Sequence, residues 1–509
     1  MNTMITAYVP YSGDDATRRT VDQLRFSGLV EKIILLAGKD ASALEGCTLS
    51  TIDGVTSAAT MRTMASTAKT PYCLVVLHDT QIEFGQFGIE RLLRVAETTG
   101  AGFVFSDYYD MKAGKRTPHP VIEYQAGSLR DDFNFGSVVL MHSGTMKKAV
   151  ADFRREKYQF AGWYALRLAM TQHAPFVRIG EFLYSKVESD ERKSGEKLFD
   201  YVDPKNRQVQ IEMEKAVTAH LKRIGGYLAP RFKKVDPAAG SFPVEASVII
   251  PVRNRVKTVG DAVTCALRQQ APFPFNVIVV DNHSTDGTTD VLRTQASRDE
   301  RLVHIIPERD DLGIGGCWNE AVHHSLCGRY AVQLDSDDMY KDETTLRKVV
   351  DVFQAERCAM VVGTYQMTNF ALEPIPPGVI EHREWTPGNG RNNALRINGL
   401  GAPRAFYTPV LRRIKIPNVS YGEDYALGLA ISREYQIGRI YEPIYLCRRW
   451  EGNSDADLDI AKLNGFNFYK DKVRTLELMA RMRIGTKSSA KPRAKSTVPK
   501  KRTDGKKRR

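Results

Sequence analysis

Short apolar runs alternate with amphipathic stretches along most of this chain, and that alternation predicts parallel sheets built from strand–helix–strand units. In the second half of the chain, apolar runs predict strands at 246–250, 276–281, 302–306 and 330–334. Apolar positions repeat at helical spacing in the stretches between them, at 257–270, 288–296 and 315–325. The expected fold class is therefore α/β, with ligands bound at the carboxyl ends of the strands.

The same pattern occurs twice along the chain. ITAYVPYSG near the start corresponds to ASVIIPVRN near the middle, and PYCLVVLHDT corresponds to RYAVQLDSDD. Later, GWYALRLAM corresponds to EDYALGLAI, and RIGEFLY to RIYEPIY. Tyr164 corresponds to Tyr425, and Glu181 corresponds to Glu442. In both pairs the two residues are 261 positions apart (425 minus 164, 442 minus 181). We therefore expect two tandem domains of common origin, 1–230 and 244–480, joined by a Gly- and Pro-rich stretch near 225–244.

The net charge of +13 is concentrated at the C-terminus. Residues 484–509 hold 11 Lys or Arg and one Asp, a net +10, which leaves +3 for the other 483 residues. This segment has no aromatic residue, so we expect a disordered basic tail. Such a tail could contact an anionic membrane, nucleic acid or an acidic partner, or could only keep the chain soluble. The near-neutral body makes nucleic acid the less expected partner.

The cysteines and the apolar runs bear on location. Seven cysteines are scattered without a CxxC pair, and an odd number favours free thiols over a disulfide framework. No run approaches the roughly 20 apolar residues that span a bilayer. The first residues lack the basic and then apolar order of a signal peptide. We expect a cytoplasmic protein, peripheral at the inner face of the membrane if its tail binds lipid.

Three acids, Asp335, Asp337 and Asp338, follow the apolar run 330–334 within four positions. Carboxylates packed so closely repel one another unless a cation joins them. Hard divalent cations such as Mg²⁺ or Mn²⁺ take oxygen ligands and often bridge to a phosphate. The stretch therefore predicts a metal–diphosphate site at the end of a buried strand, with an acidic surface turn as the alternative.

Six motifs in one order extend this interpretation: ASVIIPVRNR, VIVVDNHSTDGT, DDLGIGGCWNEAV, QLDSDD, YGEDYALGL and YLCRRWEGNS. With these motifs, residues 244–470 resemble the family-2 glycosyltransferases, which have the GT-A fold. The resemblance implies that Asp337 contacts Mn²⁺ or Mg²⁺ directly, with Asp335 near the ribose or the metal. The metal would offset the charge that develops on the leaving nucleoside diphosphate.

The resemblance also implies a nucleotide pocket. Pro251, Arg253 and Asp281 would line it, and Asp281 would accept the N–H of uracil or a similar base. The alternative for Asp281 is a cap of the turn DNHSTDG. Gly315 belongs to a loop, with Gly313 and Gly316, that the family places beside the nucleotide; a glycine loop by itself is more often only a turn.

Two further motifs supply candidate catalytic and phosphate-binding residues. The family's ED motif makes Asp424 the general base that deprotonates the acceptor hydroxyl, with Glu423 beside it. The alternative is capping of a helix N-terminus, where carboxylates are favoured. Arg448, followed by Arg449, suits a diphosphate. Trp450 stands where many relatives carry a histidine, so the contacts of this segment depart from the family pattern.

The first copy lacks this chemistry. Ala37 stands where the second copy has Asp281, and LHDT stands where it has LDSD, so that His78 and Thr80 replace the two motif acids. Gly162 and Trp163 stand in place of Glu423 and Asp424. We therefore expect a non-catalytic GT-A-like domain that binds glycan, positions a partner or supports the second domain. The alternative is a second active site on other acids, from Asp107, Asp110, Asp131 and Asp132.

Together these observations predict a metal-dependent, inverting glycosyltransferase of polysaccharide biosynthesis. It would move a sugar from a nucleoside-diphosphate donor to a saccharide or other hydroxyl acceptor, with UDP expected and GDP or dTDP as alternatives. The competing hypothesis is a non-catalytic scaffold that acts through its basic tail on nucleic acid or membrane. A third is a bifunctional transferase with two active domains.

Overall fold

The computed structural model describes residues 4–13, 15–112, 114–187, 207–450, 453 and 458–489. The strands of the first domain are β1 (Ile5–Pro10), β2 (Val30–Ala37), β3 (Thr48–Thr51), β4 (Tyr72–Val76), β5 (Ile82–Phe84), β6 (Phe103–Lys112), β7 (Lys115–His119), β8 (Val138–His142) and β9 (Phe176–Val187). Those of the second are β10 (Ala246–Val252), β11 (Phe275–Asp281), β12 (Leu302–Ile305), β13 (Tyr330–Gln333), β14 (Met339–Tyr340), β15 (Met360–Thr368), β16 (Pro374–Ile380), β17 (Arg404–Tyr407) and β18 (Ile437–Arg448).

The two sheets have one topology. The first has the order β3-β2-β1-β4-β8-β6-β9-β5, with β7 paired to β6. The second has the order β12-β11-β10-β13-β17-β15-β18-β14, with β16 paired to β15. Each strand of the first sheet thus has its counterpart at the same place in the second. The predicted α/β fold with two tandem GT-A-like domains is confirmed.

Helices connect the strands in both domains. The first has α1 (Asp15–Phe26), α2 (Ala58–Thr67), α3 (Gly88–Thr99), α4 (Ser143–Asp152), α5 (Gly162–Met170) and α7 (Arg207–Arg223). The second has α8 (Val259–Leu267), α9 (Thr288–Ala296), α10 (Ile314–His323), α11 (Thr345–Glu356), α12 (Gly390–Asn393), α13 (Thr408–Ile414), α14 (Glu423–Ser432) and α15 (Ile460–Ser489). The helix predicted at 257–270 is shorter at both ends, since the chain turns before the prolines of APFPF.

The central strands are buried on both faces. In β11 every residue is buried, and in β10 every residue except Pro251. Parallel strands covered by helices on both sides read as continuous apolar runs, which is why these strands could be predicted from the sequence. Strands β10 to β13 pair in parallel, whereas β17 joins β13 antiparallel.

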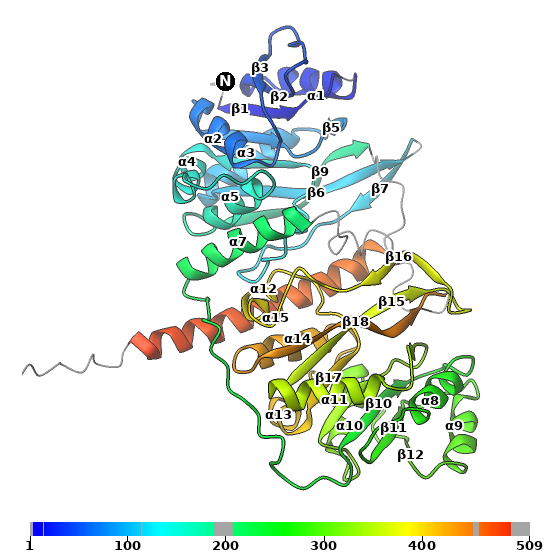
Figure 1. Cartoon of the computed structure of the whole chain (residues 1–509). Helices are drawn as coiled ribbons and strands as arrows, with labels where there is room; N and C mark the ends of the chain where they lie inside the picture. The colour runs from blue at the N-terminus through cyan, green and yellow to red at the C-terminus, as the bar shows by residue number, and fades with distance from the viewer. Residues whose placement is uncertain are drawn as a thin grey trace, which may run out of the picture.

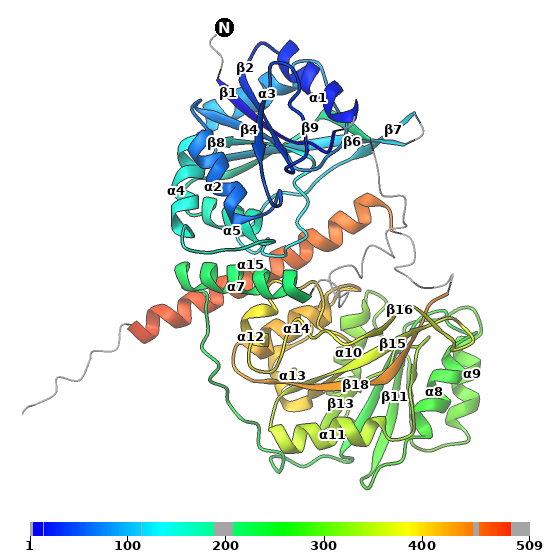
Figure 2. The ribbon, with the colours of Figure 1, turned by 45° about the horizontal axis from the view of Figure 1, so that its top comes forward.

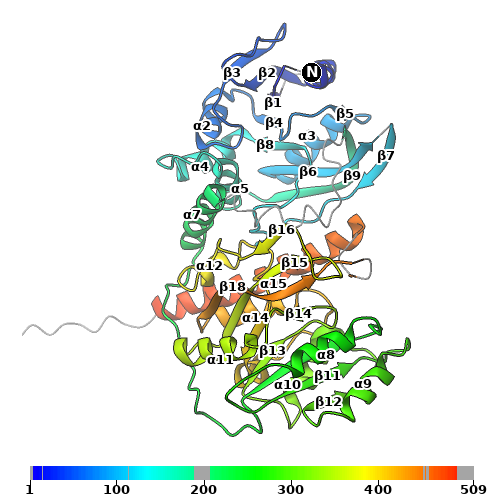
Figure 3. The ribbon, with the colours of Figure 1, turned by 45° about the vertical axis from the view of Figure 1, so that its right-hand side comes forward.

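Two long helices lie between the domains. Figure 1 shows α7 and α15 crossing between the upper sheet and the lower sheet, and the turned views agree (Figure 2, Figure 3). Each follows the last long strand of its own domain, β9 or β18, so the two helices hold equivalent places in the repeat. Helix α7 contacts α5 and also α12 of the other domain, while α15 contacts α14.

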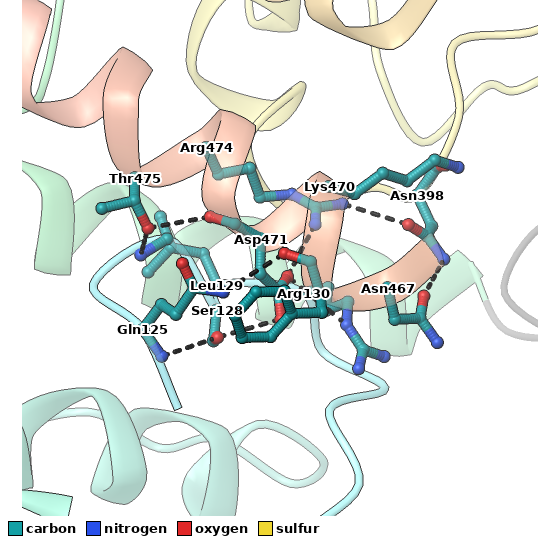
Figure 4. Close-up of polar contacts among 12 residues, drawn as sticks. Gln125, Ser128, Leu129, Arg130, Asn398, Asn467, Lys470, Asp471, Arg474 and Thr475 are labelled. Carbon is teal, nitrogen blue, oxygen red and sulfur yellow. Dashed lines mark hydrogen bonds and ion pairs between the residues drawn. The ribbon is translucent and has the colours of Figure 1, made fainter. Parts of the chain in front are cut away.

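A buried polar cluster joins α15 to the first domain (Figure 4). Asp471 is fully buried, accepts the hydroxyl of Ser128 at 2.9 Å and lies 3.5 Å from Nε of Arg130. Its other partner is Arg474, at 2.8 Å, which donates from Nε to the hydroxyl of Tyr425 on α14 at 2.8 Å. One network therefore connects a loop of the first domain to the helix that begins with Glu423 and Asp424.

The structure bears on three further expectations. All seven cysteines are free thiols. Within the described ranges, no helix combines the length and the apolar character needed to cross a bilayer. The predicted tail began at Ile484, but α15 continues to Ser489; those first residues are helical because they extend a helix already formed. The rest of the predicted tail, 490–509, lies outside the described residues.

Candidate active site

The predicted site residues come from neighbouring strand ends of the second sheet. The chain builds β11 and β12 on one side of β10 and then returns to form β13 on the other. At such a switch point the carboxyl ends of the strands leave room for a ligand. Arg253 follows β10, Asp281 ends β11 and Asp335 follows β13.

Two of the three acids after β13, Asp338 and Asp335, are held by residues of strands β13 and β18. Asp338 is buried and accepts the backbone N–H of Arg448 at 2.8 Å. Burial, and then the neighbouring charges of Asp335 and Asp337, raise the pKa of Asp338 well above its usual value. Asp335 is half-buried and accepts a hydrogen bond from Nε2 of Gln333 at 2.8 Å. Asp338 thus has a structural role, in holding the end of β18.

Asp337 faces side-chain donors across the site. Its Oδ2 lies 3.3 Å from the indole nitrogen of Trp450 and 3.3 Å from Nδ2 of Asn453. The Nε of Arg255 is 3.8 Å away. The side chain of Asp337 is 15% exposed, so its carboxylate remains open to a ligand.

Arg404, the first residue of β17, connects these acids to α14. Its Nη1 lies 2.8 Å from Oδ2 of Asp424, and its backbone N–H donates to Oε1 of Gln333 at 3.0 Å. Gln333 in turn donates to Asp335. Strand β17 begins beside the end of β13 because the two strands pair antiparallel. A continuous chain of polar contacts therefore runs from Asp424 to Asp335.

Glu423 and Asp424 form the first turn of α14, where the helix dipole favours carboxylates. Burial, and then the charge of Asp424, raise the pKa of Glu423 to about 8. Glu423 is therefore mostly protonated at neutral pH, and its Oε2 is buried without a hydrogen-bond partner in the described part of the chain. Asp424, ion-paired with Arg404, is the exposed carboxylate of the two, with 25% of its side chain accessible.

The glycine loop packs against this same segment. A Cβ at Gly315 would lie 1.9 Å from the carbonyl oxygen of Pro417 and 3.1 Å from Cβ of Glu423. Its backbone N–H donates to the carbonyl of Val419 at 2.9 Å. The close approach of the backbone at Gly315 is thus made to the chain that leads into α14.

Arg448 is almost fully buried at the end of β18. It donates from Nε to the backbone carbonyl of Asp337, and its Nη1 lies 3.0 Å from Asp261 of α8. Its Nη2 is buried and has no partner among the described residues. Arg448 therefore has donor capacity to spare beside the acids. In the first sheet the residue at the same strand position is Val187, the last of β9.

The nucleotide residues lie on either side of the β10 end. Pro251 is half-buried and Arg253 is exposed. Asp281 is fully buried; it accepts the N–H of Ser284 at 3.1 Å and the hydroxyl of Thr289 at 2.6 Å. Burial alone would raise the pKa of Asp281, but hydrogen bonds, led by that from His304, outweigh it and hold the pKa well below its usual range. These contacts match the turn-capping alternative for Asp281.

The donor set fits a divalent cation that also binds substrate. Among the described residues, no three His, Cys, Asp or Glu side chains converge as a complete metal site. Mg²⁺, however, usually takes one or two protein carboxylates and completes its shell with phosphate oxygens and water. Burial and then the charges of Asp337 and Asp424 raise the pKa of Asp335, although Arg404 opposes them. Asp335 and Asp337 thus offer the crowded oxygen ligands that a cation would neutralise.

The strand register corrects the alignment of the two copies by one residue. With Pro10 matched to Pro251, Tyr72 of β4 falls at the place of Tyr330 of β13. Counting on, Leu77 stands at the place of Asp335, and Asp79 stands at the place of Asp337. The sequence comparison matched Leu77 to Leu334 and so placed His78 and Thr80 opposite the two acids. The strand register shows that this match is shifted by one residue, and His78 and Thr80 do not replace Asp335 and Asp337.

The other three substitutions in the first domain stand at the positions that the sequence comparison gave them. Ala37 ends β2 as Asp281 ends β11, and Gly162 and Trp163 begin α5 as Glu423 and Asp424 begin α14. The position of Asp337 remains acidic in the first domain, as Asp79. The carboxylate of Asp79 accepts a hydrogen bond from the hydroxyl of Thr17 at 2.8 Å.

The acids proposed for a second active site do not gather at one place in the first domain. Asp107 is buried and paired with Arg178 at 2.7 Å. Asp110 contacts His119 at 2.5 Å. Asp131 and Asp132 instead lie on the loop that faces the second domain, where Asp131 pairs with Arg396.

Four side chains at the site were not predicted. Arg255 and Asn453 lie inside two of the six motifs, so position in a motif could have drawn attention to them. Gln333 is the first residue of a third motif, QLDSDD, two positions before Asp335. Arg404 has no local signal, since only strand pairing brings it to the acids.

Comparisons with known proteins agree with the motifs. Residues 247–413 match the family model described as Glycosyl transferase family 2. A putative teichuronic acid biosynthesis glycosyltransferase, TuaG of Bacillus subtilis, is 34% identical over 121 residues, which are 24% of this chain and 46% of TuaG. A poly(ribitol-phosphate) beta-glucosyltransferase of Bacillus spizizenii is 30% identical over 44% of this chain and 35% of its own. The chain thus matches less than half the length of these curated relatives.

A solved structure of Staphylococcus aureus TarS, residues 1–349 with UDP-GlcNAc, is 20% identical and covers 47% of this chain and 72% of that one, with a TM-score of 0.36. The resemblance drawn from the six motifs is confirmed by the family match, which lies within the second domain, at residues 247–413.

Proposed function

We propose that the protein is a metal-dependent, inverting glycosyltransferase whose one active site lies in residues 244–480. It takes a nucleoside-diphosphate sugar, UDP-linked in the first instance, and transfers the sugar to a hydroxyl of a saccharide. The observation that carries this proposal is the polar chain Asp424–Arg404–Gln333–Asp335. It holds a candidate base and a candidate metal ligand in one rigid unit, as a displacement at a sugar carbon requires.

The donor end of the site is formed by cation ligands and arginines. Asp337 and Asp335 would hold Mg²⁺ or Mn²⁺, which supplies Lewis-acid stabilisation of the leaving diphosphate. The Nη2 of Arg448, which has no partner among the described residues, and the nearby guanidinium of Arg255 can donate to phosphate oxygens. Pro251 and Arg253 would border the nucleotide. Asp281 would fix the turn beside it, and a direct bond to a base N–H would use its remaining lone pairs.

The acceptor end depends on the two carboxyl groups of α14. Asp424 takes the proton of the attacking hydroxyl, and its ion pair with Arg404 fixes the direction of the carboxylate. Glu423, protonated at neutral pH, donates a hydrogen bond or simply supports Asp424. Gly315 allows the packing that places this turn.

The names of the relatives suggest the acceptor class. TuaG is named for teichuronic acid biosynthesis and the B. spizizenii enzyme for poly(ribitol-phosphate) glucosylation. We therefore propose a bacterial surface polymer or its precursor as the acceptor. Synthesis at the cytoplasmic face of the membrane would suit a basic tail that binds anionic lipid. The first domain has no catalytic role in this proposal.

A thermal-shift screen tests the proposal, because a ligand that binds only the folded state raises the melting temperature. UDP, GDP and dTDP sugars are screened with and without Mn²⁺, and each hit is followed by release of free nucleotide in the presence and absence of acceptor glycans. We expect a Mn²⁺-dependent shift with a UDP-sugar, lost in Asp337→Ala. Activity without any divalent cation would contradict the metal, and no binding of any nucleotide sugar would favour the scaffold hypothesis.

A further inference from the structure

The first domain contains a cavity of about 380 Å³ at the place where the second domain has its candidate active site. Its walls include Leu36 near the end of β2, Leu77 after β4 and Trp163 on α5. By the shared topology, these residues correspond to Val280, Asp335 and Asp424 of the second domain. The volume lies in the range of small-ligand sites. The first domain has therefore kept the opening of an active site, with Leu77 and Trp163 in place of the acids Asp335 and Asp424.

The lining excludes a nucleoside diphosphate. Among the described residues that line the cavity there is no lysine or arginine, whereas Asp131 and Asp132 both face it. A diphosphate would meet two carboxylates and no cation, and Leu77 cannot help to hold a metal. The arginine that ends β18 is represented by Val187 in this domain. The ligand of this cavity must therefore be one that carries no phosphate.

The remaining lining suits a ring with an apolar face and hydroxyl groups. The floor is apolar and includes Met61, Met64 and Val76, with the indole of Trp163 in the wall. Polar side chains line the cavity from the loop that carries Asp131, Asp132 and Asn134, and from His78 and Thr56. Carboxylates have about four acceptor positions, so their pairing with arginines leaves positions for ligand hydroxyls. A pyranose presents C–H groups on its faces and hydroxyls around its rim.

We propose that this cavity binds an uncharged sugar unit of a glycan. The binding of a sugar in this cavity is independent of the proposed function. The further statement that this glycan is the acceptor of the second domain rests on the proposed function.

The polar wall of the cavity is also the joint between the domains. Asp131 is held by Arg396 of the second domain, and Ser128 of the same loop is held by Asp471 of α15. The loop is therefore shaped by contacts from both domains, and a glycan seated against it lies at the boundary that leads to α14. Tests of this site consequently need the full chain.

Saturation-transfer NMR on the full-length protein tests the site with three probes: methyl β-D-glucopyranoside, N-acetylglucosamine, and UDP with Mn²⁺. Thr56, an exposed residue at the cavity, is replaced by Trp to fill the space without removing a core side chain. Trp163→Phe keeps an aromatic wall, and Asp337→Ala disables the second domain. We expect at least one sugar to bind wild type, Trp163→Phe and Asp337→Ala alike, and to bind Thr56→Trp about tenfold more weakly, a change of about 1.4 kcal/mol.

The outcomes separate the two proposals. Sugar binding that is unchanged in Thr56→Trp, or no binding of either sugar to the wild type, would overturn the inference. UDP binding that Asp337→Ala leaves unchanged would instead contradict the proposed function and leave the sugar site standing. Melting temperatures of all variants identify any loss of binding that comes from unfolding.

Discussion

Asp337 and Asp338 are adjacent aspartates with different surroundings. Asp338 is buried and bound to the backbone of Arg448, whereas Asp337 is partly exposed and faces N–H donors of Trp450 and Asn453. A buried acid with a raised pKa tends toward the neutral form and is a poor cation ligand. We therefore assign the direct cation contact to Asp337; the pKa of Asp335 is also raised by burial, and a bound cation would lower it.

Replacing Asp337 by Ala should abolish transfer with little change in folding. The side chain lies outside the core, so its loss costs little stability, whereas the lost charge stabilisation should add several kcal/mol to the barrier. Initial rates at saturating Mn²⁺ and melting temperatures measure the two effects. The matched control is Asp290→Ala, an acid that is 80% exposed on α9 and should retain full activity. Full activity of the wild type in excess chelator would rule out the metal.

Asp424→Asn keeps the shape of the side chain and removes the proton acceptor. Turnover should fall by roughly 10² or more while donor affinity survives. Glu423→Gln is the matched control, since glutamine resembles the protonated acid that a pKa of about 8 predicts at pH 7. Single-turnover rates and donor titrations distinguish the two. A large loss in Glu423→Gln with a small one in Asp424→Asn would reverse the roles of the two residues.

The sequence was informative about acids and less so about their partners. The run at 335–338 and the pair at 423–424 are local patterns, so both could be read directly. Arg404 lies far from both along the chain and meets them only because β17 pairs with β13. Likewise, no local signal shows that the acid at 281 is closed off by Thr289 and His304.

At the scale of the elements, α15 joins the domains through the buried cluster around Asp471. Asp471→Asn removes the buried counter-charge of Arg474 and leaves Arg130 paired with Asp132. Breaking a buried pair in this way costs about 3–5 kcal/mol, so the melting temperature should fall markedly. Lys472→Gln, an exposed change one residue along the same helix, should stay within about 0.5 kcal/mol. Equal stability of the two variants would show that the cluster adds nothing to the joint.

Helix α7 carries a histidine that should make stability depend on pH. Burial, and then the charges of Arg223 and Arg167, lower the pKa of His220 to about 3 from 6.5. Below pH 6.5 the unfolded chain therefore binds a proton that the folded chain does not, and stability is lost as pH falls toward 3. At pH 5 the loss is about 2 kcal/mol.

Denaturant unfolding at pH 7.5 and pH 5 compares wild type with His220→Gln. The variant should lose less stability between the two pH values than wild type, by about that amount. An identical loss in both proteins would show that His220 titrates normally in the folded state.

Helices and strands could be predicted from the sequence where burial alone determines the pattern of apolar residues. Strands β10, β11 and β13 are continuous apolar runs, and α9 occupies the residues predicted for it. The extension of α15 into the predicted tail could not be read, since a basic segment without large apolar residues gives no helical pattern. The placement of α7 and α15 between the domains depends on tertiary contacts, which periodicity does not report.

At the scale of the whole molecule, the chain contains two copies of one fold, and the candidate catalytic residues lie in the second copy. Even a surface ion pair is repeated: Arg91 with Glu181 in the first domain and Lys348 with Glu442 in the second, on equivalent helices and strands. The constant offset in the sequence revealed this repeat. The register at LHDT was fixed by the strand pairing, which agrees with the longer match of PYCLVVLHDT to RYAVQLDSDD and not with the four-residue match of LHDT to LDSD.

The central claim is one sugar-nucleotide site per chain, in the second domain. Calorimetric titration of the full-length protein with a UDP-sugar and Mn²⁺ tests it most directly, on wild type, Asp337→Ala and Thr56→Trp. The account predicts one UDP-sugar bound per chain, binding lost in Asp337→Ala, and binding unchanged in Thr56→Trp. Two bound per chain, or binding that persists in Asp337→Ala and disappears in Thr56→Trp, would place the nucleotide in the first domain and contradict the account.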